Sequence, residues 1–441
     1  MKKFGSYIAI SLAILIVATV CFLYFFDYLE REKPAIKLNQ KIIAIGKLKN
    51  VEITFSDQKS GLSNMIVEIV QDNKGHILAN ENISSRGTKQ KNLFVSIDTT
   101  SLKLHDGPAT INITAADYSI FRNQTIESLT VTIDTIPPQI TLLSTINHAN
   151  QGGTCFIAYR TSKPADLTGV YVNDYFTAGY ALMIDNKPAS VTYFALPYNA
   201  SSAKTKITVL VRDYAGNETR ISPPCLIKEK KFRSDKMNLS ETFLQQKMPE
   251  FQAMVPTLQG KTPLEIFSYV NSEMRNDNFR SIQSVCQKST PKILWEGTFL
   301  RMRSASPMAL FGDKRTYVVA GKDFADSVHA GVDLASVAHA AIEAANSGTV
   351  VFAGPLGIYG NAIIIDHGLG IFSLYGHLSS IDTAAGKTVK KEEVIGHSGT
   401  SGLAGGDHLH FSMIVGGQFV NPQEWWDAHW IEDNINKKMR L

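Results

Sequence analysis

The sequence predicts a mainly β protein that begins with one transmembrane helix. An uncharged run from Phe4 to Phe26 follows the opening Met-Lys-Lys. Beyond it, short stretches with alternating β-branched residues recur between clusters of turn residues, which is typical of antiparallel strands. A last segment, dense in Gly and short apolar runs, indicates a compact β domain with tight turns. With 441 residues, the chain is long enough for about two to four domains.

The apolar run, residues 4–26, predicts a signal-anchor helix. It can span about 30 Å of hydrocarbon, whereas the core of a signal peptide has only about 7–15 residues. No small-x-small cleavage site follows the run, so we expect the helix to stay in the membrane; the alternative is a cleaved signal. Lys2 and Lys3 favour a cytoplasmic N-terminus, which places everything after Asp27 outside the cytoplasm.

Charge and cysteine content exclude two classes of function. The formal net charge is only +4 and the basic residues form no stripe, so we expect no nucleic-acid partner. No C-x-x-C motif occurs, which argues against a zinc site built from thiolates. Cys155 and Cys225 fall in one predicted domain and could bridge in an oxidising compartment.

Two immunoglobulin-like β-sandwiches are predicted, over residues 35–136 and 137–228. Segments such as "KNVEITFS", "NMIVEIVQ" and "TCFIAYR" alternate as sandwich strands do. "TINITAADY", ending at Tyr118, is echoed by "KITVLVRDY", ending at Tyr214, which is one such domain later. Pro137 and Pro138 interrupt the strands between the two copies and mark the joint.

Residues 229–290 predict a helical connector. Leu264, Phe267 and Val270 or Asn271 recur at helical intervals, and Thr262-Pro263 is a suitable helix start. Residues 291–430 predict the compact β domain, and residues 431–441 remain as a tail.

Eight of the 11 histidines lie in this last part of the chain. "VHAGVDLA" places His329 four residues before Asp333, "SLYGHLS" contains His377, and "GDHLHFS" contains His408 and His410. Residues two apart on a strand point to the same face, so the last pair could reach one point. A metal ion is the obvious candidate, although a single H-x-H pair is a weak motif.

From His329 to Pro422 the order and wording of these motifs resemble the lysostaphin-like zinc endopeptidases, the LytM-type peptidoglycan hydrolases. The resemblance covers about a quarter of the chain and implies a lysostaphin-like antiparallel β peptidase domain. By resemblance, Zn²⁺ is held by His329, Asp333 and His410, while His377 and His408 are catalytic histidines that do not bind the metal. It also implies a bacterial protein of the inner (cytoplasmic) membrane, with its catalytic domain in the periplasm or facing the wall, and peptidoglycan peptides as substrate.

The chemistry of these residue types agrees with that assignment. Two neutral imidazoles and one carboxylate leave zinc an open fourth position, as in catalytic rather than structural sites. The remaining two histidines can transfer protons or stabilise an oxyanion. By contrast, His367 and His397 lie beside turn glycines and are expected to be structural, and His339 and His429 carry no pattern. Asn361 could shape the cleft or cap a turn, and "GTSGLAGG" predicts a loop at the edge of the groove.

Two other functions compete with a zinc metalloendopeptidase. LytM-type proteins include silent regulators that bind and activate other wall hydrolases, but these typically lack some of the five residues, and all five are present here. The immunoglobulin-like domains could instead bind a protein partner, since such folds host many functions. A glucose-specific phosphotransfer domain is discarded, because the chain has the H-x-x-x-D grouping and an extracytoplasmic placement.

Overall fold

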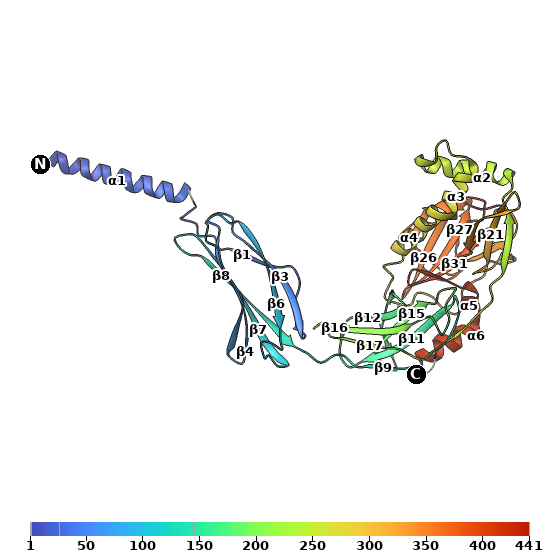
Figure 1. Ribbon diagram of the computed structural model, residues 1–441, viewed down its shortest axis with the longest axis horizontal. Helices are drawn as coiled ribbons and strands as arrows, with labels where there is room; N and C mark the ends of the chain where they lie inside the picture. The colour runs from blue at the N-terminus through green and yellow to red at the C-terminus, as the bar shows by residue number, and fades with distance from the viewer. Residues whose placement is uncertain (1, 26, 145–146, 441) are drawn as a thin grey trace. The chain divides into compact units, whose positions relative to one another are not determined.

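The computed structural model describes residues 2–25, 27–144 and 147–440, and the protein is mainly β as predicted. It divides into two compact units, whose elements are labelled in Figure 1. The first unit contains Met1–Pro138, Lys163–Asp166 and Arg212–Thr219. The second contains Gln139–Ser162, Leu167–Val211 and Arg220–Leu441.

Helix α1 (Lys2–Phe25) corresponds to the predicted apolar run. Its segment Tyr7–Tyr24 has a mean hydropathy of 2.5, and none of it is buried in the protein. In length and composition the helix can cross a membrane, and a signal sequence near an N-terminus has the same properties. Phe26, the last residue of the predicted span, lies outside the described residues.

Eight strands follow α1 and form two sheets, ordered β1-β3-β6 and β2-β8-β7-β4-β5. Along β7 every second side chain from Ala109 to Asp117 is buried, because successive residues of a strand point to opposite faces. Ile53, Ile69 and Ile111 lie in the core between the sheets. This first β region contains β1 (Ala35–Leu38), β2 (Ala44–Ile45), β3 (Leu48–Ser56), β4 (Leu62–Gln71), β5 (Lys74–Asn82), β6 (Gln90–Asp98), β7 (Gly107–Asp117) and β8 (Gln124–Ile133).

The second β region has two four-stranded sheets, ordered β14-β15-β11-β9 and β13-β12-β16-β17, and a parallel pair, β10-β18. Cys155 and Cys225 are free thiols that hydrogen-bond to each other. The immunoglobulin-like class of both β regions, with limits at 35–136 and 137–228, stays a prediction. The strands are β9 (Ile140–Leu142), β10 (Asn147–Asn150), β11 (Thr154–Thr161), β12 (Ala165–Val172), β13 (Tyr175–Ala178), β14 (Tyr180–Ile184), β15 (Lys187–Ala195), β16 (Ile207–Asp213), β17 (Glu218–Ile221) and β18 (Cys225–Lys228).

The connector is helical but also contributes a strand that the sequence pattern did not predict. Strand β19 pairs in parallel with β21 of the next region. The predicted helix start is correct: Thr262 and Glu265 form a capping box, and Pro263 is the first helical residue. The elements are β19 (Ser234–Asn238), α2 (Glu241–Met254), η1 (Pro256–Leu258), α3 (Pro263–Tyr269), the π-helical turn η2 (Val270–Met274) and α4 (Arg275–Val285).

The C-terminal β domain is built on a large antiparallel sheet ordered β20-β23-β31-β27-β26-β25-β29, with β32 paired to β31. A smaller sheet is ordered β24-β30-β28, and β21 and β22 form a further sheet with β19 of the connector. The strands are β20 (Ser306–Ala309), β21 (Lys314–Val319), β22 (Lys322–Val328), β23 (Val332–Ala335), β24 (Ala341–Glu343), β25 (Gly348–Pro355), β26 (Asn361–Gly368), β27 (Ile371–Leu378), β28 (Ser380–Ile381), β29 (Thr388–Val389), β30 (Val394–His397), β31 (Leu409–Val415) and β32 (Gln418–Val420), with the 3₁₀ turn η3 (Gly357–Tyr359).

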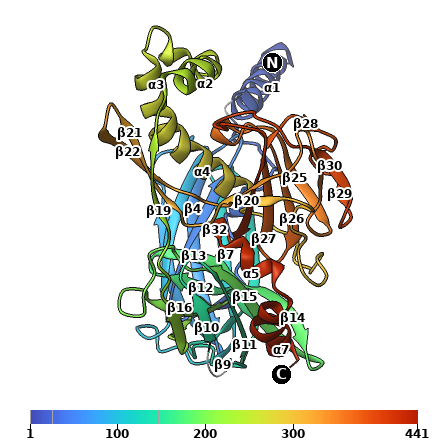
Figure 2. The same ribbon diagram turned by 90° about the vertical axis from the view of Figure 1, so that its right-hand side faces the viewer.

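Both faces of the large sheet are covered, which explains the unbroken apolar run "AIII" in β26. Ile364 belongs to one core together with Phe267 and Ile282 of the connector helices. Ile363 and Ile365 belong to the core on the opposite face. Helix α4 lies along the sheet in two perpendicular views (Figures 1 and 2). The connector therefore forms part of the packed structure around the sheet.

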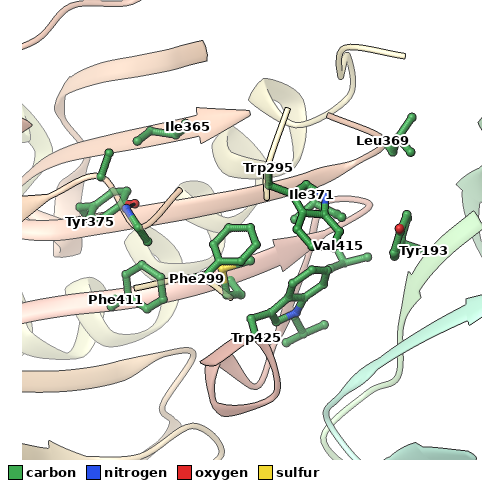
Figure 3. Packing of buried hydrophobic residues seen from close by; sticks show 14 of the residues in the cluster. Tyr193, Trp295, Phe299, Ile365, Leu369, Ile371, Tyr375, Phe411, Val415 and Trp425 are labelled. Carbon is green, nitrogen blue, oxygen red and sulfur yellow. Dashed lines mark hydrogen bonds between the residues drawn. The ribbon is translucent and has the colours of Figure 1, made fainter. Parts of the chain in front are cut away.

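The opposite face of the sheet shares its core with the second β region (Figure 3). The ring of Trp425 lies 5.6 Å from that of Trp295 and 6.3 Å from that of Tyr193 in β15, measured between centroids. Beside it, Glu424 accepts hydrogen bonds from the Asn150 side chain and the Thr154 backbone, each at 2.7 Å. The second β region and the C-terminal domain are thus packed as one unit.

Short helices end the chain, where the sequence suggested only a tail. Ile431 and Ile435 are buried, and the ammonium of Lys438 donates to the Asn147 side chain at 3.0 Å and to the Phe156 carbonyl at 3.1 Å. These helices are α5 (Pro422–Trp426), α6 (Ala428–Ile431), the π-helical turn η4 (Glu432–Asn436) and α7 (Lys437–Met439). Leu441 lies outside the described residues.

Candidate functional site

Three of the five predicted site residues meet where β23 pairs with β31. Asp333 lies on β23 directly opposite His410 on β31. His329 lies in the segment that joins β22 to β23, where its backbone N–H donates to the Asp313 carbonyl at 2.9 Å. His329 and Asp333, four residues apart, are therefore brought together by this connecting segment and do not lie on one continuous strand. All three side chains are buried.

The three polar atoms converge on one point. His329 Nε2 lies 2.9 Å from Asp333 Oδ1 and 3.1 Å from His410 Nδ1, and His410 Nδ1 lies 2.9 Å from the same carboxylate oxygen. His329 Nδ1 donates to the Leu310 carbonyl at 3.0 Å, so its Nε2 carries the lone pair. His410 Nε2 is 2.9 Å from the Ser412 hydroxyl. When Nε2 donates its proton to this hydroxyl, His410 Nδ1 carries no proton and can act as a ligand.

Asp333 is held ionised by its neighbours. Burial alone would raise the pKa of this carboxyl, but the adjacent rings of His329, His408 and His410 outweigh burial and hold its pKa well below the ordinary value. Its second oxygen, Oδ2, accepts a hydrogen bond from Arg315 Nη2 at 3.0 Å. Asp333 Oδ1 is thereby left for the convergence point.

His410 resists protonation. Burial lowers its pKa to about 4, although Asp333 acts in the opposite direction. A neutral imidazole beside an ionised carboxylate is the form in which these side chains bind divalent metals.

The other two predicted residues, His377 and His408, lie beside this group. Their ring centroids are 4.8 Å apart, and His408 Nε2 is 3.6 Å from Asp333 Oδ1. His377 Nδ1 donates to the Ser401 carbonyl and His408 Nδ1 to the Gly406 carbonyl, each at 2.8 Å. Each ring is therefore oriented by a backbone acceptor on its Nδ1 side.

The two rings differ electrostatically. Burial and the neighbouring histidines hold the pKa of His377 well below its ordinary value. Burial also acts to lower the pKa of His408, but its contact with Asp333 prevails and raises it. His377 has a backbone φ of 63°, which non-glycine residues seldom adopt and which is common at functional sites.

These groups line a cleft of about 650 Å³. Its wall includes Gly405 and Gly406, from the loop that the sequence placed at the groove edge, and Phe243 and Arg275 from the connector helices. The Lys247 ammonium of α2 donates to the Thr400 carbonyl, and Glu250 accepts from the Gly402 backbone at 3.0 Å. The connector thus borders the cleft directly.

The remaining predicted histidines lie apart from the convergence point. His367 is buried against the Ser347 carbonyl and the Ser373 hydroxyl, and burial lowers its pKa to about 4. His397 ends β30, the central strand of the small sheet, and contacts Ser380 and Asp382. His339 and His429 are exposed.

Asn361 has a structural role at the start of β26. Its side chain donates to the Leu378 carbonyl at 3.2 Å, and its backbone N–H donates to the Ser401 hydroxyl at 2.9 Å. Both contacts join β26 to the neighbourhood of His377.

Three residues beside the group were not found from the sequence. They are Arg315, Ser412 and Tyr359, whose ring centroid lies 5.3 Å from that of His410. Ser412 could have been found, because it lies two residues after His410 and so on the same face of the strand. No local pattern points to Arg315 or Tyr359, which reach the group from β21 and the turn η3.

Comparisons with known proteins agree on the C-terminal domain. Residues 327–422 match peptidase family M23. The DD-carboxypeptidase/endopeptidase Mpg of Neisseria meningitidis is 44% identical over 79 residues, which are 18% of each protein. The murein hydrolase activator EnvC of Escherichia coli is 37% identical over 83 residues, which are 19% of this chain and 20% of EnvC.

Among solved structures, the catalytic domain of lysostaphin from Staphylococcus simulans is 27% identical, with 29% of this chain and 96% of that chain covered and a TM-score of 0.25. The matches to Mpg and EnvC span about a fifth of their lengths. The match to the family, residues 327–422, contains all five predicted site residues. In residues 327–422 the chain therefore carries a C-terminal domain of peptidase family M23.

Proposed function

We propose that this protein is a zinc-dependent endopeptidase that hydrolyses peptide cross-links of cell-wall peptidoglycan. The observation that carries the proposal is the convergence of three lone-pair atoms, from His329, Asp333 and His410, within 3.1 Å of one another. When His329 Nδ1 and His410 Nε2 carry the ring protons, no proton lies between His329 Nε2, Asp333 Oδ1 and His410 Nδ1. A cation at this point would offset the cost of burying the unpaired carboxylate.

The residues fit zinc. Ligand atoms at about 2.0–2.1 Å from a tetrahedral zinc are about 3.3 Å apart, so the observed separations need to open only slightly. Two imidazoles and one carboxylate leave one position open for water or substrate. A zinc ion held there supplies Lewis acidity, which polarises a peptide carbonyl and lowers the pKa of water.

His377 and His408 would handle protons and developing negative charge on the substrate. Both rings lie at the cleft and are oriented through Nδ1, so Nε2 of His377 faces away from its backbone acceptor, while Nε2 of His408 lies 3.6 Å from Asp333 Oδ1. A positioned imidazole can accept a proton from the attacking water or stabilise the oxygen that becomes negative.

The substrate class is supported by similarity and by the predicted topology. Mpg, the Neisseria relative, is described as a DD-carboxypeptidase/endopeptidase. Helix α1 as an uncleaved anchor would leave the M23 domain on the outer side of the bacterial inner membrane, where peptidoglycan lies. The immunoglobulin-like domains would be free to bind a protein partner on the same side.

A second candidate is a non-catalytic regulator of other hydrolases, because EnvC is described as a murein hydrolase activator. The presence of all five histidine and aspartate residues at one cleft favours the enzyme. The two functions differ in one measurable respect, which is turnover by the purified protein alone.

The test uses the full chain purified in detergent, with zinc content measured by mass spectrometry and release of peptides from purified peptidoglycan measured by chromatography. We expect one zinc per chain and cross-link cleavage, both lost in His410→Ala. His429→Ala removes an exposed histidine of the same domain and is the matched control, which should keep both properties. Zinc-loaded protein that leaves cross-links intact would support the regulator, and stoichiometric zinc in His410→Ala would disprove the ligand set.

A further inference from the structure

A second cluster of potential metal ligands lies in the first compact unit, outside the M23 domain, and consists of three buried carboxylates. Glu30, Asp57 and Asp117 each offer one oxygen, and these oxygens lie within 4.8 Å of one another. Only 5%, 3% and 2% of the respective residues are exposed. Neither the sequence motifs nor the M23 chemistry uses these residues.

The three carboxylates come from three separate segments. Glu30 follows α1, Asp57 lies in the turn between β3 and β4, and Asp117 ends β7. The segment after α1 is held to the β7–β8 turn by backbone contacts as well: the Ile120 N–H donates to the Tyr28 carbonyl at 3.0 Å. The cluster is therefore the place where the chain leaving α1 meets the first β region.

Among the described residues, no ion pair balances the negative charge of these three carboxylates. In the part of the chain that the structure describes, no lysine or arginine forms a salt bridge with any of the three carboxylates. Arg86 lies over the ring of Tyr28, with 3.4 Å between its Cζ and the ring centroid, and its Nε and Nη2 are buried without a hydrogen bond. Carboxylates buried this closely repel one another unless a cation or protons lie between them.

Unpartnered oxygens at the same place point to a cation. Glu30 accepts from the Ser60 backbone through Oε2 at 2.7 Å, but its Oε1 is buried without any hydrogen bond. The Ser60 hydroxyl, on a residue only 1% exposed, also has no partner. The Asp57 side chain accepts from the Lys59 and Gly61 backbones through Oδ1 only. Two buried oxygens of this region, Glu30 Oε1 and Ser60 Oγ, thus have no hydrogen-bond partner.

The turns that hold the carboxylates are themselves well ordered by hydrogen bonds. Asp117 accepts from the Ser119 backbone at 3.1 Å and from the Asn123 side chain at 2.7 Å. The same Asn123 amide donates to the Glu30 carbonyl at 3.0 Å. The oxygens are therefore presented by a preformed scaffold, which lowers the cost of binding.

We propose that Glu30, Asp57 and Asp117 bind one calcium ion that fastens the segment after α1 to the first β region. All donors are oxygens, which selects a hard cation over zinc, and carboxylates from irregular turns suit the flexible coordination of calcium better than the strict octahedron of magnesium. Water and the Ser60 hydroxyl would complete its shell of six to eight oxygens. The ion would stiffen the junction between the anchor helix and the rest of the protein.

Calcium binding is measured on the full, zinc-loaded chain in detergent by isothermal titration calorimetry, with a parallel titration of magnesium. We expect one calcium per chain with a dissociation constant on the order of 10⁻⁴ M, as in extracellular modules, and weaker binding of magnesium. Hydrogen exchange, measured by mass spectrometry, should slow in segments 27–34, 57–63 and 117–123 when calcium is added. The reason is that the ion binds only when the three carboxylates are together, and so opposes local opening.

Asp57→Asn keeps the shape of the side chain and should weaken calcium binding about tenfold or more, because it removes one ligand charge. Asp72→Asn changes the same charge at an exposed turn of the same region and should bind calcium like the wild type. No calcium binding up to about 10 mM, or equal binding in Asp57→Asn, would overturn the proposal. If the Asn variant does not fold, the wild-type titration and exchange data decide alone. Equal affinity for magnesium would contradict the assignment to calcium.

Discussion

His377 and His408 lie next to the proposed metal ligands without being part of the converging set. Replacing either by Ala should leave zinc bound and reduce hydrolysis of wall peptides by about 10²–10⁴-fold, the usual contribution of a proton-transfer group. Zinc content and initial rates on the same preparations separate the two effects. His397→Ala, which removes a histidine from strand β30 of the small sheet, is the control. A rate near that of the wild type in either variant would remove that residue from the mechanism.

Arg315 contacts the proposed ligand Asp333 on the side away from the convergence point. Arg315→Met should weaken zinc binding or activity by about 10–100-fold, as is typical when a partner that orients a ligand is lost. Arg315→Lys should recover only part of the loss, because an ammonium lacks the planar fork of donors.

Competition of the Arg315 variants with a zinc chelator measures the change directly. Arg303→Met is the matched control, since Arg303 pairs with Glu343 and Glu392 elsewhere in the domain, at 3.2 and 3.0 Å. Unchanged zinc affinity and unchanged rate in Arg315→Met would show that the Asp333 carboxylate is positioned by its strand alone.

Helix α5 carries a titratable group at the contact between the C-terminal part of the chain and the second β region. Burial raises the pKa of Glu424 to about 7, although hydrogen bonds from Asn150 and the Thr154 backbone act the other way. An unfolded Glu titrates near 4.3, so the folded state holds the proton more tightly. The stabilisation is fully present below about pH 4 and is lost as pH rises through about 7.

Glu424→Gln removes this dependence while Asn150 can turn its amide to accept a hydrogen bond. Between pH 5 and pH 8 the wild type should lose on the order of 3 kcal/mol of unfolding free energy relative to the variant. Urea unfolding of the full chain at several pH values, followed by Trp fluorescence, measures the difference. Parallel pH profiles for the two proteins would mean that Glu424 does not change its protonation across this range.

Helix α1 can be either a membrane anchor or a signal sequence, and the two predict different locations for the protein. As an uncleaved anchor it should make the chain fractionate with membranes, resist extraction by high salt and dissolve in detergent, with a C-terminal tag accessible only from the outer face. A chain that lacks residues 1–26 is the control and should stay in the soluble fraction. Recovery of a soluble mature form that begins between Asp27 and Pro34 would identify α1 as a signal sequence instead.

Local pattern was sufficient for much of this protein. The uncharged run predicted α1, alternating residues predicted a mainly β chain, and Thr262-Pro263 predicted the start of α3. These features depend on interactions between residues close together in the sequence, so sequence patterns can predict them. The five candidate site residues were found through separate motifs in one order, and the fold brings them to one cleft.

Other features were decided only by contacts between segments distant in sequence. Arg315 reaches Asp333 from another strand, and Glu30, Asp57 and Asp117 meet from three turns, so no spacing along the chain predicts either group. Likewise, the packing of Trp425 with Tyr193, which joins the C-terminal part of the chain to the second β region, depends on which faces meet in three dimensions. Sequence by itself determined which side chains are available and which elements carry them; the tertiary structure decided their neighbours, because burial and hydrogen bonding depend on distance in space and not along the chain.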